Sequence, residues 1–579
     1  MLRFFKSICL LADPSSPKDK HTFFAAHWIF GRCLGLVSFF AFLSYWLQAD
    51  ALIGPDGLNP WQADLQAIEN LCHDQGKDSR KWILRPTILW LDSIGNHHFI
   101  FLIGSFSALL LSIGILPFFT GFICYLSYLS LIVVGEPFLS FQWDVLLTET
   151  LFLSLFFLPQ CGLHRFSKSQ RFPRISRLLL VALLAKLMIE SGVVKFTYFA
   201  PDGTNTWKDL TALNFHYWSQ PLPHPLSPLI DSLPSWFDRT SLFIMYAIEL
   251  ILPLLFFLPG RWRRFALLGQ VSLQLMILVS GNYGFFNFLT LCLCIPLIDD
   301  QMLPNRLTNR IISTESKSIP AVFYFRNICL LPVIFVFASS TYGHLLNDLR
   351  GNRVPKTESW KVPRWIDDLQ NQTRILRCFN SYGLFRVMTT TRPEIIIEAS
   401  KDGKTWHTCE FEWKPSHSNQ KLKFTGPHMP RLDWQMWFEG LNFENYAKHT
   451  FSRFLYGRFL QIKMKNPQNS VFWDLKKVLG EKEFQALNQA PPQVQRQAIA
   501  NYNQLIQSFL SRSSWFANLL VAIAENRPSV MDRLSASKPL KFKPSFLRVS
   551  LRHFSFSDKE DQIWEIEKIP NASYVLKIE

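Results

Sequence analysis

Apolar runs recur along the first 340 residues of the chain, and short polar stretches separate them. A helix needs about 20 apolar residues to cross the hydrocarbon core of a membrane. Several runs are shorter than that and bounded by proline, so we predict about seven to nine spans. The candidate spans are residues 23–47, 99–117, 119–134, 141–158, 178–194, 242–258, 265–280, 285–298 and 319–340. This pattern predicts a polytopic α-helical membrane bundle over residues 23–341.

Beyond Tyr342 the pattern changes to one typical of strands. Residues 394–399 have a strand-like composition, and the KDG sequence at 401–403 has hairpin-turn chemistry. Apolar and polar residues then alternate over 408–413. Alternation with a period of two indicates a half-buried strand. We therefore expect residues 380–465 to be β-rich.

The end of the chain has a different pattern. Residues 472–534 are mostly helical in pattern, with proline breaks, and a weaker strand pattern lies in the tail beyond them. Together these segments predict an α+β, β-rich domain over residues 342–579. The predicted fold is thus a membrane bundle followed by a separate domain on one side of the membrane.

Basic residues give the orientation. The formal net charge is +16, from 60 Lys and Arg against 44 Asp and Glu, but no motif for binding RNA or DNA occurs, so we expect no nucleic-acid partner. Cytoplasmic loops of membrane proteins retain Lys and Arg. The residues that mark this side are Arg3, Lys6, Lys18, Lys20, Arg165, Lys168, Arg171, Arg174, Arg177, Arg261, Arg263, Arg264, Arg306, Arg310 and Lys317. We predict a cytoplasmic segment at 1–22, with the 196–236 loop and the C-terminal domain on the opposite side.

Motifs of catalysis and metal binding are missing from the sequence. The ten cysteines are scattered, without the spacing of a zinc site or a disulfide framework, and neither a nucleophile elbow nor a phosphate loop occurs. His97 and His98 lie at the mouth of a span and cannot make a metal site alone, which favours a hydrated or capping role. We expect no cofactor and no metal.

The candidate functional residues inside predicted spans include four charged ones, and a charge there is costly unless it is paired or turned into the protein. Lys186 and Glu190 are four residues apart on one helix face, and we expect them to pair with each other. Asp144 and Glu149 are about 140° apart on their helix, which disfavours a paired general acid and base. At the outer boundary Asp144 would be hydrated, whereas Glu149 needs a partner, such as Lys186 or a polar group of another span.

A polar and aromatic loop follows the span at 178–194. Its candidate functional residues are Lys195, Trp207, Asp209, His216, Tyr217 and Gln220. They could bind a polar headgroup or support proton transfer, but an internal hydrogen-bond network of the loop is favoured. Near the GNYG turn, Asn282 and Asn287 pose a similar choice between hydrogen bonding among helices and a polar cavity for a ligand.

An aromatic helix face is predicted in the segment 426–441. Trp434, Trp437 and Phe438 can share one face, and Asp433 is a further candidate in the same segment. Such a face is usually part of a core, and the alternative is a surface for a partner protein. Both interpretations are kept at this point.

Several long segments resemble the lipase maturation factor family. They are GEPFLSFQWDVLLTET, SGVVKFTYFAPDGTNTWKDLTALNFHYWSQPLPHP, LVSGNYGFFNFLT, NSYGLFRVMTTTRPEIIIEASKDGKTWHTCEFEWKP and PHMPRLDWQMWF. The resemblance implies a multi-pass membrane protein that, in animals, resides in the endoplasmic reticulum and helps secreted lipases to fold and assemble. The chain departs from the family where Lys186 stands for an arginine and Glu190 occupies a normally uncharged neighbourhood. The membrane half is also faintly similar to the transmembrane domain of vitamin K-dependent carboxylases.

Two functional hypotheses follow. The first is a non-enzymatic maturation factor or chaperone whose C-terminal domain contacts client lipases or other secreted proteins through the segment Trp434 to Phe438. The second is a membrane-embedded enzyme or lipid-binding protein with a pocket formed by Lys186, Glu190, Lys195, His216 and Asn282. Membrane lipids are expected partners in both. The membrane is that of the endoplasmic reticulum in a eukaryote and the inner membrane in a bacterium.

Overall fold

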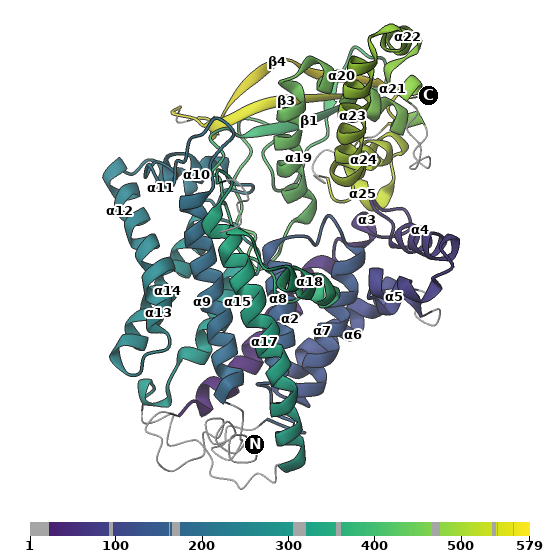
Figure 1. The fold of residues 1–579 in the computed structure, drawn as a ribbon. Coiled ribbons are helices and arrows are strands. Elements are labelled where there is room, and N and C mark those ends of the chain that lie inside the picture. Colours follow the sequence, from purple (N-terminus) through teal and green to yellow (C-terminus); the bar gives the residue numbers. More distant parts are fainter. Residues whose placement is uncertain are drawn as a thin grey trace.

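Upright helices form one end of the molecule, and a small sheet with its own helices forms the other (Figure 1). The computed structural model describes residues 22–91, 96–160, 162–164, 174–304, 320–354, 360–465, 475–534, 540, 542–559 and 561–578. The predicted segment 1–22, except its last residue, lies outside the described residues. So do Arg165, Lys168, Arg171, Arg306, Arg310 and Lys317 of the orientation analysis.

Each of the nine predicted apolar runs is helical in the part of the chain that the structure describes. The helices are α2 (Phe24–Trp46), α6 (His97–Ile113), α7 (Pro117–Val134), α8 (Gln142–Ser154), α9 (Arg174–Thr197), α12 (Ser235–Tyr246), α13 (Leu252–Leu255), α14 (Arg261–Ser280), α15 (Phe286–Cys294) and α17 (Pro320–Arg350). A π-helical turn, Ala247–Ile251, joins α12 to α13. Among the described residues, three helical segments are long and apolar enough to cross a membrane: α2, α7 and Ile328–Arg350 of α17.

Small residues let the helices of this bundle approach closely. A Cβ atom on Gly35 of α2 would lie 2.4 Å from the backbone nitrogen of Ser112 on α6. On α6, a Cβ atom at Gly104 would lie 2.5 Å from the ring of Phe42 on α2. Close packing of this kind is the main source of helix association in a membrane, where apolar burial contributes little. The outward faces of α12 to α14 expose large apolar side chains, which suits a surface covered by lipid.

Short elements connect the main helices. They are α3 (Ala49–Leu52), α4 (Trp61–Asp74), α5 (Lys81–Leu84), α10 (Leu213–Ser219), α11 (Ser227–Asp231) and α18 (Arg364–Thr373). The 3-10 turns are Asp78–Arg80, Ile88–Trp90, Ile295–Leu297, Asp300–Met302 and Arg374–Leu376. In Figure 1, α4 and α5 lie beside the bundle below the C-terminal helices, and α18 lies across it.

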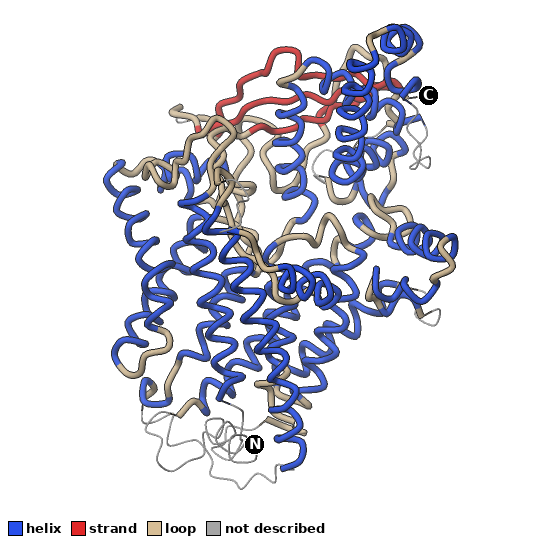
Figure 2. Tube along the Cα trace, in the orientation of Figure 1, coloured by secondary structure: helices blue, strands red, loops and turns tan. Residues whose placement is uncertain are grey.

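The C-terminal domain has a four-stranded antiparallel sheet in the order β2-β1-β3-β4 (Figure 2). Its strands are β1 (Pro393–Ser400), β2 (His407–Thr408), β3 (Phe546–Phe556) and β4 (Trp564–Lys577). Its helices are α19 (Arg431–Ala447), α20 (Thr450–Lys465), α21 (Leu475–Leu479), α22 (Glu481–Gln489), α23 (Pro492–Ser508), α24 (Ser514–Glu525) and α25 (Pro528–Met531), with a π-helical turn at Phe509–Ser513.

The prediction of a β-rich segment at 380–465 is wrong. That segment supplies only β1 and the two-residue β2, and its second half is the helices α19 and α20. The β3–β4 hairpin at the end of the chain completes the sheet, and β1 pairs with β3 along its whole length. The strand predicted at 394–399 is confirmed as β1, in which every residue is buried, but the alternation over 408–413 contributes only Thr408 to the two-residue β2.

Candidate functional site

A buried ion pair joins the bundle to the C-terminal domain. The two terminal guanidinium nitrogens of Arg431, the first residue of α19, donate to the carboxylate of Asp144 on α8, Nη2 at 2.8 Å and Nη1 at 2.9 Å. Tyr128 Oη donates to Asp144 Oδ1 at 2.6 Å, and Arg431 also donates to the Phe138 carbonyl at 2.8 Å. Neither charged side chain is exposed. The expectation of a hydrated Asp144 is therefore wrong, because α19 covers this point of the bundle.

The end of α2 is attached to the same place. Gln48 Oε1 accepts a hydrogen bond from the backbone nitrogen of Arg431 at 2.9 Å, and Gln48 Nε2 donates to the Met429 carbonyl at 2.8 Å. Ser44 Oγ accepts from the backbone nitrogen of Met429 at 2.8 Å. These bonds satisfy backbone groups at the start of α19 that have no partner inside the helix. Arg431 is therefore held in place by two helices of the bundle.

Residues 380–386 enter the bundle next to α8 and α9. Glu149 Oε2 accepts from the backbone nitrogen of Asn380 at 2.9 Å and from Tyr382 Oη at 2.7 Å. Glu190 Oε2 accepts from the backbone nitrogen of Tyr382 at 2.7 Å. Two carboxylates of the bundle thus hold one short segment of the C-terminal half. We call this segment, together with the Asp144–Arg431 pair, the joint.

Lys186 pairs with Glu149, whose Oε1 lies 3.8 Å from Lys186 Nζ. The predicted pair of Lys186 with Glu190 is therefore wrong, because the backbone of Tyr382 takes the Glu190 carboxylate instead. The ion pair of Glu149 with Lys186, which was one of the two partners predicted for Glu149, does form. A positive charge beside this carboxylate reduces the cost of its burial.

Lys195, at the end of α9, is paired with a residue that the sequence analysis missed. Its Nζ lies 2.7 and 2.6 Å from the two carboxylate oxygens of Glu249, which is in the π-helical turn. The Trp207 ring lies against the same ammonium group, 5.3 Å from Nζ to the ring centroid, and Trp207 Nε1 donates to the Phe385 carbonyl at 2.9 Å. The loop is thereby tied both to the bundle and to the joint.

His216 belongs to a hydrogen-bond network of the loop. Tyr283 Oη lies 3.1 Å from His216 Nε2 and donates to Gln220 Oε1 at 3.0 Å. Because the single hydroxyl proton of Tyr283 is donated to Gln220, the hydrogen bond between His216 Nε2 and Tyr283 Oη must be donated by His216 Nε2. Burial, followed by the charge of Lys195, lowers the pKa of His216 to about 4, so the ring is neutral at pH 7. This is the favoured internal network, and it leaves out Asp209, which is exposed.

Asn282 and Asn287 have different roles. Asn287 Nδ2 donates to Gln274 Oε1 at 3.0 Å, a bond between neighbouring helices of the bundle. Asn282 instead connects the two halves of the protein. It donates to the Lys423 carbonyl at 2.9 Å and accepts from the backbone nitrogen of Thr425 at 2.9 Å.

The aromatic face of α19 is mostly core. Trp434 packs edge-on against Trp143 of α8 at a centroid distance of 4.8 Å, and Trp437 Nε1 donates to the Ser219 carbonyl at 2.8 Å. Tyr217, next to Ser219, is also buried. The hypothesis that Trp434 and Trp437 contact clients is therefore wrong, because both are covered by the bundle and the loop. Only Phe438 of this face is exposed, at 39%.

Asp433 organises the start of α19. Its Oδ1 accepts from the backbone nitrogens of Trp413 at 3.0 Å and Lys414 at 2.9 Å. Burial raises the pKa of Asp433 to about 6. The side chain holds the loop before α19 against the helix, and we assign it no chemistry.

The pocket of the enzyme hypothesis does not form. Lys186 contacts Glu149, Glu190 contacts Tyr382, Lys195 contacts Glu249, His216 contacts Tyr283, and Asn282 contacts Lys423 and Thr425. These groups do not converge on one space, because each has its own partner from a different element. The specific pocket proposed from the sequence is therefore wrong.

A second buried charge cluster holds the loop against the sheet. Glu394 lies 2.8 Å from Arg392 and 2.9 Å from Lys414. Arg392 also donates to the carbonyls of Trp218 and Pro221, at 2.8 Å each, and to the carbonyl of Gln220. Asn380, Tyr382, Arg392 and Arg431 lie in the segments that resemble the family, but the sequence alone indicates no role for them. The only signal was charged residues within otherwise apolar, aromatic segments.

A cleft of about 780 Å³ lies on the side of the joint. Its walls come from the loop after α3, the turn between α7 and α8, and the helices α19 and α24. The residues that line it include Asn59, Glu136, Phe141, Gln435, Phe438, Asn442 and Trp515. At its base, Glu439 accepts from Tyr456 Oη at 2.5 Å and Ser513 Oγ at 3.1 Å, and burial raises the pKa of Glu439 to about 7.

Comparison with known proteins identifies the family. Residues 25–305 match the family model described as "Lipase maturation factor transmembrane domain", and residues 378–503 match "Lipase maturation factor C-terminal domain". Lipase maturation factor 2 of Xenopus tropicalis is 32% identical, over 73% of this chain and 71% of the relative. Lipase maturation factor 1 of Mus musculus is 28% identical, over 78% of this chain and 80% of the relative. No solved structure matches. The chain belongs to the lipase maturation factor family.

Proposed function

We propose that this protein is a membrane-anchored maturation factor that assists secreted lipases as they fold and assemble. The observation that carries the proposal is the match to both domains of the lipase maturation factor family. The two domains follow each other in the same order along this chain, and the joint connects them. Relatives that align over more than two thirds of their length are named for that role. The buried contacts of the joint support it, since they fall inside both matched regions.

The bundle spans the membrane several times, with the C-terminal domain on the side away from the cytoplasm. Two observations support this orientation. Arg177 and Arg263 both lie over the Phe23 ring, at 3.8 and 5.0 Å, so the basic starts of α9 and α14 meet the start of α2. The sheet lies at the opposite end of the molecule (Figure 1). Basic residues gathered at one end favour that end as the cytoplasmic one. In a eukaryote the membrane is that of the endoplasmic reticulum, and in a bacterium it is the inner membrane.

The joint gives the C-terminal domain a fixed position above the bundle. Three carboxylates of the bundle, Asp144, Glu149 and Glu190, are each bonded to the C-terminal half. Opening this contact would break the charge-assisted hydrogen bonds that these carboxylates accept, and such bonds are stronger than those between neutral groups. A client bound to the C-terminal domain would therefore be held at a constant height and angle relative to the membrane. This favours assistance by binding and orientation rather than by chemistry.

The cleft is the proposed contact surface for an unfolded client segment. Phe438 is exposed at its edge and stacks on Phe141 at a centroid distance of 6.0 Å. Trp515 lies in the wall of the cleft but is only 3% exposed, and Asn59 and Asn442 also line the cleft with amide groups. Rigid aromatic side chains surrounded by hydrogen-bonding groups suit an extended peptide with an apolar side chain.

Complementation tests both the role and the surface. Cells of the source organism that lack this protein are expected to secrete lipase of low specific activity, and the wild-type gene restores it. Phe438→Ala should restore it poorly, whereas Phe454→Ala, on α20 and exposed to 38%, should restore it fully. Normal lipase activity in the cells that lack the protein would contradict the proposed function. Equal rescue by the two variants would contradict the cleft alone.

A further inference from the structure

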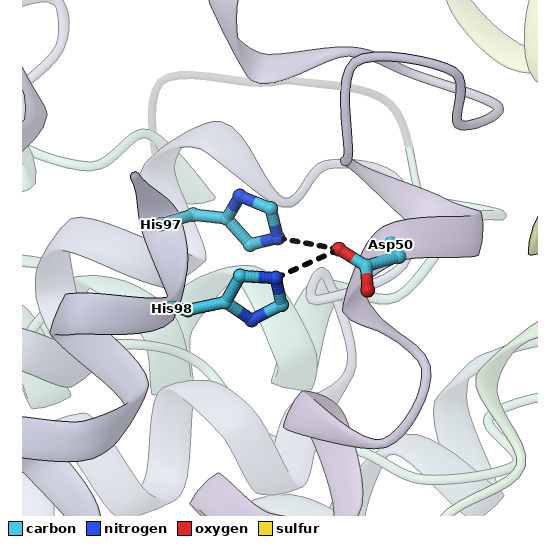
Figure 3. Close-up of side chains that lie close together, drawn as sticks. All are labelled: Asp50, His97 and His98. Atoms are coloured by element: carbon cyan, nitrogen blue, oxygen red, sulfur yellow. Dashed lines mark hydrogen bonds and ion pairs between the residues drawn. The ribbon is translucent and has the colours of Figure 1, made fainter. Parts of the chain in front are cut away.

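Two neighbouring histidines and an aspartate converge at the end of α2 (Figure 3). His97 Nε2 and His98 Nε2 both lie 3.1 Å from Asp50 Oδ1. One ligand atom from each residue lies within 4.8 Å of the other two. From the sequence, the two adjacent histidines cannot form a metal site alone. The structure supplies the third residue from α3.

This convergence is unusual for adjacent helical residues. Side chains at neighbouring positions of a helix point about 100° apart, so they do not face each other. Here the histidines are the first two residues of α6, and Asn96 caps the helix by accepting from the backbone nitrogen of His98 at 2.9 Å. The two rings lie 4.3 Å apart at 32°, and His97 packs edge-on against Phe101. The surroundings therefore hold both rings toward Asp50.

We propose that Asp50, His97 and His98 bind a divalent transition-metal ion of the Zn²⁺ type. Zn²⁺ binds imidazole nitrogen and carboxylate oxygen at about 2.0–2.2 Å, which places tetrahedral ligand atoms about 3.3–3.5 Å apart. The two nitrogen–oxygen distances of 3.1 Å need only a small adjustment to reach this value. Two imidazoles favour zinc and its neighbours over Mg²⁺ and Ca²⁺, which prefer oxygen ligands. The Asp50 side chain is 60% exposed, so water can reach the fourth position.

Trp46 determines where the protons are before the ion binds. Its Nε1 can only donate, and it donates to His98 Nδ1 at 2.8 Å, so the proton of the neutral ring is on Nε2. When the ion binds through His98 Nε2, the proton moves from Nε2 to Nδ1 of the same ring, so the neutral imidazole keeps its one proton. The indole N–H then loses its acceptor. Trp46 therefore opposes loading of the site, and Trp46→Phe should bind the ion at least as tightly as the wild type.

The ion would strengthen the link between the bundle and the C-terminal domain. Asp50 is in α3, and α25 of the C-terminal domain packs against α3. Arg533 donates to the Leu47 carbonyl at 2.9 Å, just before α3, and Asn518 donates to the Leu58 carbonyl at 2.8 Å, just after it. Fixing α3 to the start of α6 would therefore fix the segment on which these contacts depend.

Titration of the full-length protein in detergent tests the proposal, with an affinity tag that contains no histidine. Calorimetry with Zn²⁺ is expected to show one bound ion per chain, and Co²⁺ should give the strong visible absorption of a four-coordinate site. His97→Ala and Asp50→Asn should weaken Zn²⁺ binding at least tenfold. The matched control is His73→Ala, because His73 faces Asp78 at 3.5 Å in an exposed pair.

The outcomes decide the proposal directly. Asp50→Asn keeps the size of the side chain, and gel filtration with thermal unfolding shows whether each variant remains folded. The four proteins compared are the wild type, His73→Ala, His97→Ala and Asp50→Asn. Tight Zn²⁺ binding by the wild type and His73→Ala alone supports the site. Failure of the folded wild type to bind Zn²⁺, or equal affinity in all four, would overturn it. Loss of binding in folded Trp46→Phe would overturn the proposed proton shift.

Discussion

The buried pair of Asp144 and Arg431 gives the sharpest test of the joint. Arg431→Met removes both charged hydrogen bonds and leaves the Asp144 carboxylate buried, with the Tyr128 hydroxyl as its remaining donor among the contacts described above. Removing one partner of a buried pair costs about 3–5 kcal/mol. Since about 1.4 kcal/mol corresponds to a factor of ten, the open joint should become more populated by about 100-fold or more.

Native-state proteolysis measures this population. Arg386 is a trypsin site within the joint, and its rate of cleavage follows the open population when the joint recloses faster than trypsin cuts. We expect this rate to rise about 100-fold or more in Arg431→Met. The control is Lys448→Met, which removes the ion pair of the exposed Lys448 side chain with Glu444, at a distance of 3.8 Å. Exposed pairs contribute about 0–1 kcal/mol, so the control should stay within a few-fold of the wild type.

A second variant separates charge from packing. Adding Asp144→Asn to Arg431→Met removes the unpaired carboxylate, so the double variant should be cleaved more slowly than Arg431→Met alone. If Arg431→Met were cleaved no faster than Lys448→Met, the ion pair would not hold the joint closed. If the double variant were cleaved faster than the single one, the unpaired charge would not be the cause.

Three further predictions concern other buried groups. Lys195→Met leaves the buried Glu249 carboxylate without its ion-pair partner and should lower the free energy of unfolding by about 3–5 kcal/mol in a denaturant titration. Adding Glu249→Gln should recover part of this loss. An unchanged denaturation midpoint in Lys195→Met would contradict the prediction. Tyr382→Phe removes one donor to a buried carboxylate and should cost about 1–3 kcal/mol in the same titration, so a neutral result would show that the hydroxyl is dispensable. Burial raises the pKa of Glu439 to about 7 from 4.5, so its contribution to stability is largest below about pH 4.5 and is lost as the pH rises to about 7. Glu439→Gln should flatten that dependence in unfolding measurements across this range, and an unchanged slope would exclude Glu439 as its source.

The helices of the bundle follow from the sequence because each is encoded locally by a continuous apolar run. The sheet follows only in part, because the composition of residues 394–399 indicates β1, whereas the longer strands β3 and β4 come from the end of the chain, where the strand pattern is weak. Sequence alone indicated that Glu149 needs a partner, since an unpaired carboxylate is costly inside a membrane. It could not identify Asn380 and Tyr382, because contacts between residues so far apart in the chain leave no periodic signal.

The same limit applies to the charged residues. Lys186 and Glu190 have the spacing of a helical pair, but a backbone N–H from another segment is a better partner for Glu190. Arg431 is preceded by proline and starts a helix, which suggests an exposed position, yet it is fully buried. Adjacent histidines likewise carry a metal-binding signal only once folding brings Asp50 to them.

The account requires the C-terminal domain and its lipase clients to be on the same side of the membrane, away from the cytoplasm. Two reporters fused separately to the C-terminus test this directly: a phosphatase that is active only outside the cytoplasm, and a fluorescent protein that matures only inside it. We expect the phosphatase fusion to be active and the fluorescent fusion to be dark. Bright cytoplasmic fluorescence with an inactive phosphatase would contradict the account.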